Sequence, residues 1–263
     1  MKPALEVQAL GLMLGQRAVL HGVDVRIPAG RWTCVVGPNG AGKSSLLKAL
    51  AGLLPTSGQV RWHGQDLKNL DRRARKNLDR RARGLQLSWL GQGEATTLDL
   101  RVWDVAMLGR LPHQGWWGTP TAQDEQMCEA ALKATQAWDW RERTLGELSG
   151  GERQRVLLAR AMAANASIML MEMDEPLANL EPPHPVDWVE QVHCVRAQGT
   201  TVVRVLHDIG LALHADDIIV MAQGRIVHHG ACQDEATHRA IEAVFDQRIR
   251  ICPLEGQWVV LPK

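Results

Sequence analysis

The sequence predicts an α/β fold with a parallel sheet at its centre, an N-terminal antiparallel β-subdomain and an inserted α-helical subdomain. Two apolar runs in the second half, SIMLMEMDEP (167–176) and TTVVRVLHD (200–208), end in polar residues, and each follows a helix-like stretch. That order is typical of parallel α/β units. Residues 5–27 instead alternate short β-prone runs with turn signals, which predicts antiparallel strands. Between 93 and 163 the pattern is mostly helical.

The composition fits one globular domain in a reducing compartment. The chain has 263 residues, 45% of them hydrophobic, which is enough to bury a core. Its formal charge of +1 does not indicate a nucleic acid or an acidic membrane surface as partner. The five cysteines are scattered, with no CxxC pair, as isolated cytosolic thiols are. No stretch approaches the about 18 apolar residues of a spanning helix, so we expect another chain to cross any membrane.

One eight-residue segment is duplicated in tandem. Residues 68–75 read KNLDRRAR, and residues 76–83 read KNLDRRAR again. The repeat is either a basic patch for acidic lipid or nucleic acid, or a solvated surface helix or loop, and we favour the second interpretation. Eight residues are close to two helical turns, so an exposed helix can take up the insertion with its face turned by only about 80°.

A phosphate-binding loop follows the apolar segment from Trp32 to Val36. The residues after it read GPNGAGKS and match GxxxxGK[ST], between a strand and a helix that we expect to end near Pro55. Backbone amides of such a loop converge on phosphate, the lysine reaches the β and γ oxygens, and the final hydroxyl binds Mg²⁺. The candidate nucleotide-binding residues here are Gly37, Pro38, Asn39, Gly40, Ala41, Gly42, Lys43, Ser44 and Ser45.

A second candidate phosphate site opens another helix. Residues 148–154 read LSGGERQ and precede the helical pattern RVLLARAMA. Ser149, Gly150, Gly151 and Glu152 begin this helix, where a hydroxyl and bare amides can receive an anion at the positive end of the helix dipole. A Ser-Gly-Gly helix start by itself is ordinary capping, so its functional meaning depends on the first loop.

Together, GPNGAGKS and LSGGERQ resemble the ABC ATPase family, whose signature sequence is LSGGQ. The resemblance implies a P-loop NTPase (RecA-like) core with its β-subdomain over residues 1–92 and 164–263, and a helical signature subdomain over 93–163. It also implies ATP and Mg²⁺ as cofactors. In that family the signature of one copy covers the γ-phosphate held by the loop of another, which implies an ATP-sandwich homodimer.

The resemblance extends to the catalytic positions. Gln92 is similar to the glutamine that senses Mg²⁺ and the attacking water, and Asp174 to the aspartate that holds Mg²⁺. Glu175 resembles the residue that orients or deprotonates the water, and His207 the histidine that contacts the γ-phosphate. The candidate metal ligands are therefore Ser44, Gln92 and Asp174, and the candidate catalytic residues are Glu175, His207 and Gln92.

Three positions depart from the family pattern. Two extra residues near Glu172 and Met173 separate the apolar strand from Asp174, so we expect Glu172 at a strand bulge or near the metal, or else impaired hydrolysis. Glu181 replaces the aspartate of the loop that crosses the dimer interface, residues 178–181. Leu14 stands where an aromatic residue stacks on adenine, so we expect apolar contact with the base instead.

A final motif indicates the kind of transporter. Residues 105–118, VAMLGRLPHQGWWG, resemble the LGR-x-PH segment in ATPases of iron-siderophore, haem and cobalamin importers. That likeness implies integral membrane permease subunits as partners, indirect work with a periplasmic or surface substrate-binding protein, and a peripheral place on the cytoplasmic face of the membrane. Trp116 and Trp117 are either anchors for the permease or packed inside the helical subdomain. The alternatives are a soluble ABC ATPase acting on nucleic acid and a hydrolysis-impaired regulatory cassette; we expect no nucleic-acid partner.

Overall fold

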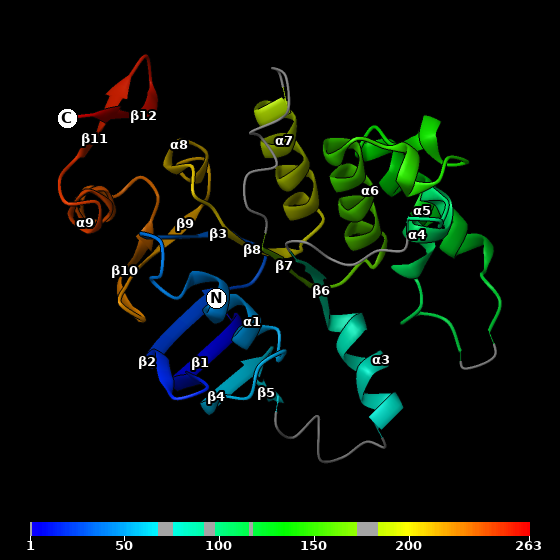
Figure 1. Cartoon of the computed structure of the whole chain (residues 1–263), viewed down its shortest axis with the longest axis horizontal. Helices are drawn as coiled ribbons and strands as arrows, with labels where there is room; N and C mark the ends of the chain where they lie inside the picture. Colours follow the sequence, from blue (N-terminus) through cyan, green and yellow to red (C-terminus); the bar gives the residue numbers. More distant parts are fainter. Residues whose placement is uncertain (1, 68–75, 92–97, 116–117, 173–183) are drawn as a thin grey trace.

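The centre of the molecule is a six-stranded sheet (Figure 1). The structure is a computed structural model, and it describes residues 2–67, 76–91, 98–115, 118–172 and 184–263. The strand order is β10-β9-β3-β8-β7-β6, and all neighbours are parallel except β9 and β10. The strands are β3 (Trp32–Val36), β6 (Leu87–Leu90), β7 (Ile168–Glu172), β8 (Thr201–Val205), β9 (Asp217–Ala222) and β10 (Arg225–Ala231). The predicted parallel α/β core is confirmed.

Both faces of this sheet are covered, which explains its continuous apolar strands. Every residue of β3, β7 and β8 is buried, as expected for parallel strands between two layers. Helix α1 (Lys43–Leu50) packs on one face and joins the core shared with the N-terminal strands. On the other face lie α7 (His184–Ala197), α8 (Ile209–Ala212) and α9 (Glu235–Val244).

The predicted N-terminal antiparallel strands form a four-stranded sheet in the order β2-β1-β4-β5. They are β1 (Pro3–Leu14), β2 (Arg17–Pro28), β4 (Ser57–Trp62) and β5 (Gln65–Asp66). A separate hairpin of β11 (Ile249–Leu254) and β12 (Gln257–Pro262) ends the chain and contacts α8 and α9. The sequence reading did not anticipate this hairpin.

Helix α1 ends earlier than expected, at Leu50 rather than near Pro55. Gly52 adopts a φ of 68°, and its N–H donates to the Ala49 carbonyl at 3.0 Å, while the Leu53 N–H donates to the Lys48 carbonyl at 2.9 Å. This pair of bonds is a Schellman motif, which ends a helix at a left-handed glycine. The glycine in ALAGLL therefore outweighs the apolar periodicity that continues beyond it.

A helical subdomain with its own apolar core lies between β6 and β7 in the chain. It contains α4 (Val102–Leu108), α5 (Ala122–Ala134) and α6 (Gly150–Ala163) and two short 3₁₀ turns, Trp138–Trp140 and Leu145–Glu147. Among the described residues, no helix is long and apolar enough to cross a bilayer.

The second KNLDRRAR copy begins helix α3 (Lys76–Gln86), which runs directly into β6. Figure 1 shows α3 below the central sheet, between the antiparallel strands and the helical subdomain. The first copy, residues 68–75, lies outside the described residues.

A buried ion pair ties the helical subdomain together. Arg110 Nε donates to Asp124 Oδ1 at 2.8 Å, and both side chains are almost fully buried. Asp124 Oδ2 accepts the Thr121 N–H at 2.9 Å and the Thr121 hydroxyl at 2.8 Å, which completes a capping box at the start of α5. The Thr121 N–H, together with Arg110, holds the pKa of Asp124 at about 2.

We expect Asp124→Asn to lower the free energy of unfolding by about 3 kcal/mol, because it leaves the Arg110 charge buried without a counter-ion. Urea unfolding followed by tryptophan fluorescence measures this. Asp104→Asn is the matched control, since the Arg101–Asp104 pair is exposed and should contribute under about 1 kcal/mol. Because the folded pKa of Asp124 is depressed, its contribution is fully present above about pH 4 and is lost as the pH falls to about 2. Equal effects of the two substitutions would contradict the assignment.

Candidate functional site

The loop between β3 and α1 takes a conformation that requires glycine at its first position. Gly37 has a φ of 147°, and a Cβ there would lie 2.2 Å from the backbone oxygen of Met221 on β9. Gly40 and Gly42 also have positive φ, and Gly42 is the N-cap of α1. The loop thus lies against the neighbouring strand, and the amino end of α1, with Ser44 and Ser45, lines the hollow described below, a position that favours an anion.

Lys43 lies across its own loop. Its side chain is buried with 5% exposure, and Nζ donates to the carbonyl oxygens of Gly37 at 2.7 Å and Pro38 at 3.1 Å. These bonds hold a positive charge at the mouth of the loop. A bound phosphate would meet this ammonium group and the helix amides together.

An open hollow of about 1000 Å³ surrounds these groups. On the side of the phosphate loop it is lined by Asn39, Gly40, Ala41, Gly42, Lys43, Ser44 and Ser45. Leu14 and Arg17, which pair across the β1–β2 hairpin, form another part of the wall. Leu14 is 47% exposed, so its apolar side chain is available to a base. Gly37 and Pro38 take part through the bonds they accept from Lys43.

His207 lies in the same hollow, immediately beyond the end of β8. Its neighbour Asp208 accepts the Leu211 N–H at 3.1 Å and caps α8, which fixes the backbone at this turn. The structure therefore brings His207 together with the phosphate loop, although the two are more than 160 residues apart in the chain.

The second candidate phosphate site is well formed but lies elsewhere. Glu152 N–H donates to Ser149 Oγ at 3.3 Å, and Ser149 N–H donates to Glu152 Oε2 at 2.7 Å, a reciprocal capping box at the start of α6. The Ser149 N–H lowers the pKa of Glu152, so the carboxylate stays ionised. Ser149 and Gly150 are exposed. Neither they nor Gly151 and Glu152 line the hollow.

Several predicted site residues fall outside the described part of the chain. Gln92, which follows β6 by two residues, is one of them, and Asp174 and Glu175, which follow β7, are two more. Residues 178–181 and the pair Trp116 and Trp117 also lie outside it. Their assignments remain predictions.

The bulge, one of the alternatives expected for Glu172, is absent from the described part of β7, which ends at Glu172. Strand β7 pairs with β8 in unbroken parallel register from Ile168 to Glu172, with Glu172 opposite Val205. Glu172 is 4% exposed. Its carboxylate forms an ion pair with Lys48 Nζ on α1, at a distance of 3.0 Å. Lys48 was not among the predicted partners of Glu172. Its basic side chain, about one helical turn beyond the phosphate loop, is the feature of the sequence that indicates such a partner.

A family model described as ABC transporter matches residues 20–178, more than half of the chain. The chain belongs to the ABC transporter family. It is 36% identical to the hemin import ATP-binding protein HmuV of Pseudomonas putida, covering 98% of this chain and 100% of the relative. It is 33% identical to the ferric enterobactin transport ATP-binding protein FepC of Escherichia coli, covering 98% and 93%. This cassette is therefore an ATPase.

Solved structures share its fold. An inward-facing, putative metal-chelate type ABC transporter superposes with a TM-score of 0.78 at 21% identity, covering 100% of this chain and 98% of the other. A dimeric ATP-binding cassette in a post-hydrolysis state, bound to ADP and Pi, superposes with a TM-score of 0.74 at 22% identity, covering 88% and 99%.

The Lys48–Glu172 pair predicts an asymmetric response to mutation. Lys48→Met leaves a buried carboxylate without its counter-ion and should lower the free energy of unfolding by about 3 kcal/mol. Glu172→Gln removes the partner of Lys48, but that ammonium group is already half exposed and can be hydrated. The substitution should therefore lower the free energy of unfolding by less than about 1 kcal/mol. The double substitution should regain most of the loss. Urea unfolding checks the series, with Lys133→Met in an exposed pair as control; equal single effects would refute the buried charge.

Proposed function

We propose that this ATPase powers a membrane importer as one of two copies that close around ATP. The observation that carries the proposal is the separation, within one chain, of the two phosphate sites: the hollow at α1 and the exposed, capped start of α6. A second copy can supply its α6 start to the γ-phosphate held by the first, so that each triphosphate is bound from both sides. Hydrolysis then removes the link between the copies.

Within the hollow, each group has a distinct task in the proposal. Lys43 and the amides at the start of α1 hold the β- and γ-phosphates. The Ser44 hydroxyl, which lines the hollow beside Lys43, is an oxygen ligand of the kind that Mg²⁺ accepts together with phosphate oxygens; bound there, the ion would neutralise phosphate charge. Asp174 and Gln92 would complete the metal ligands, Glu175 would orient or deprotonate the water, and His207 would contact the γ-phosphate.

The division of labour follows the proposed domains. Residues 1–92 and 164–263 bind the nucleotide, and 93–163 carry the signature and receive the permease. We place the subunit peripherally on the cytoplasmic face of the membrane, bound to integral permease subunits and, through them, to a periplasmic or surface substrate-binding protein. The names of the hemin and ferric enterobactin relatives and the LGRLPH segment favour a haem, iron-siderophore or cobalamin cargo.

Impaired hydrolysis is the less favoured alternative. Impaired hydrolysis was expected because an unpaired charge at Glu172 would be costly in a buried strand. Lys48 forms an ion pair with Glu172 and so compensates that charge.

Glu175→Gln should trap an ATP-bound dimer, because it removes the proposed base without changing either phosphate site. Sizing chromatography with Mg-ATP measures the dimer. Adding Ser149→Phe to the trapped variant should return it to monomer while nucleotide binding by each copy persists. Finding only monomer at all protein concentrations would count against closure around ATP.

Leu14→Tyr should tighten ATP binding by about twofold to twelvefold, since ring stacking adds roughly 0.5–1.5 kcal/mol to apolar contact. Competition with a fluorescent ATP analogue gives the affinity. Met13→Tyr is the matched control, because Met13 is adjacent and similarly exposed but is not among the residues that line the hollow. An equal gain in both variants would remove Leu14 from the base site.

A further inference from the structure

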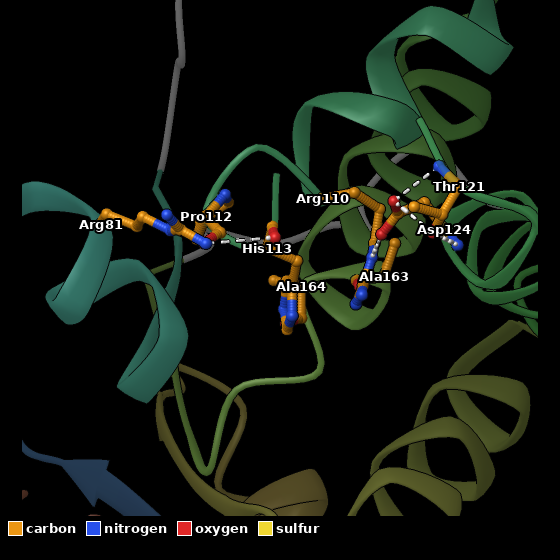
Figure 2. Close-up of polar contacts among 8 residues, drawn as sticks. All are labelled: Arg81, Arg110, Pro112, His113, Thr121, Asp124, Ala163 and Ala164. Atoms are coloured by element: carbon orange, nitrogen blue, oxygen red, sulfur yellow. Dashed lines mark hydrogen bonds and ion pairs between the residues drawn. The ribbon is translucent and has the colours of Figure 1, made fainter. Parts of the chain in front are cut away.

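The turn after α4 is fixed to the far end of helix α6. Arg110 Nη1 donates to the Ala163 carbonyl at 2.8 Å, and His113 Nε2 donates to the Ala164 carbonyl at 2.7 Å (Figure 2). Gly109 lies so close to α6 that a Cβ there would be 2.2 Å from the Arg160 oxygen. Three contacts therefore attach this turn to the carboxyl end of the helix whose other end is the signature.

Helix α3 holds the same turn from the side of the core. Arg81 Nε donates to the Pro112 carbonyl at 2.9 Å, and Arg81 Nη2 donates to the His113 carbonyl at 3.4 Å. Figure 2 shows the guanidinium reaching out from α3 toward both carbonyls. Gly84, one turn later, has no side chain, and a Cβ there would lie 2.5 Å from Pro112 Cγ. Both residues place α3 directly against the turn.

The two attachments differ in strength. The bonds of Arg110 are buried, whereas those of Arg81 are exposed to water. A buried charged contact is costly to break, and an exposed one is exchanged readily for water. The contacts of the turn with the helical subdomain are therefore harder to break than its contact with α3.

From these contacts we propose that Arg81 is a positioning residue, which sets the orientation of the signature helix α6 relative to the ATP-binding core. The chain of contacts that connects the core with Ser149 starts at β6 and α3 and passes through Arg81 to the turn after α4. It then follows α6, which is about 21 Å long, to Ser149. The inference rests on the proposed function, because the orientation of Ser149 matters where it must meet ATP on a second copy. A fixed orientation lowers the entropy lost on closure.

The duplicated octapeptide provides a control position for Arg81. Arg81 and Arg73 occupy the same place in identical octapeptides. Arg81 stands three residues before Gly84 and contacts the turn. Arg73 lies outside the described residues, and we assign it no part in this contact. Substitutions of Arg81 and of Arg73 can therefore be compared in the same local sequence.

The experiment compares Arg81→Met with Arg73→Met in the full-length Glu175→Gln protein. Sedimentation with Mg-ATP should show a dimer dissociation constant about fivefold higher for Arg81→Met, the factor expected for one net hydrogen bond, and unchanged for Arg73→Met. Arg81→Lys should restore part of the loss, because it can still donate to one carbonyl. Binding of a fluorescent ATP analogue in EDTA should be the same in all variants.

A second measurement tests the contact without relying on ATP. Hydrogen exchange at residues 108–114 should be faster in Arg81→Met than in Arg73→Met, at equal thermal stability. Equal exchange and equal dimer formation in the two variants would overturn the proposal, as would an equal loss in both. If the Glu175→Gln protein itself forms no dimer, the proposed function fails, and hydrogen exchange still decides whether Arg81 holds the turn.

Discussion

The close approach of Gly37 to strand β9 is the constraint on which the nucleotide site depends. With the loop backbone close to the Met221 oxygen, the chain must turn sharply out of β3, and the amino end of α1 then lines the hollow. Lys43 can reach back to the start of the loop because the turn is this tight. One missing side chain thus determines the direction of a helix, the position of a cation and the shape of the hollow.

Ion pairs that involve buried charges lie at two joints between elements of the fold. Lys48 and Glu172 join α1 to the end of β7, and Arg110 and Asp124 join the turn after α4 to α5. Such pairs contribute little net stability, but a buried member left without its partner is costly, so they disfavour other arrangements of the same elements. Both pairs lie beside functional segments: the first precedes Asp174, and the second supports the turn that Arg81 reaches.

Features encoded locally could be predicted from the sequence, and those that depend on distant partners could not. The phosphate loop and the Ser149–Glu152 cap are each formed by residues close together in the sequence. Their glycines and hydroxyl groups are therefore enough to predict the local conformation. The ion pair of Glu172 could not be predicted, because its partner Lys48 lies 124 residues earlier in the chain. The end of α1 was predicted too late because the apolar periodicity continues past Gly52, the residue that ends the helix. Arg81 looked like one of many surface charges, since nothing in KNLDRRAR distinguishes the copy that meets a carbonyl pair.

In the proposed closure of two copies around ATP, the orientation of a rigid helix is the quantity to control. The hollow is formed by the core alone, and its cation and amides are in place without a partner. The capped start of α6 is equally complete, because its serine and glutamate satisfy each other. Both halves are formed within a single copy, so the variable on which the proposed closure depends is the angle between the core and the helical subdomain. An exposed contact at the opposite end of α6 can bias that angle without touching the nucleotide, and the long lever of the helix makes a small rotation there a large displacement at Ser149.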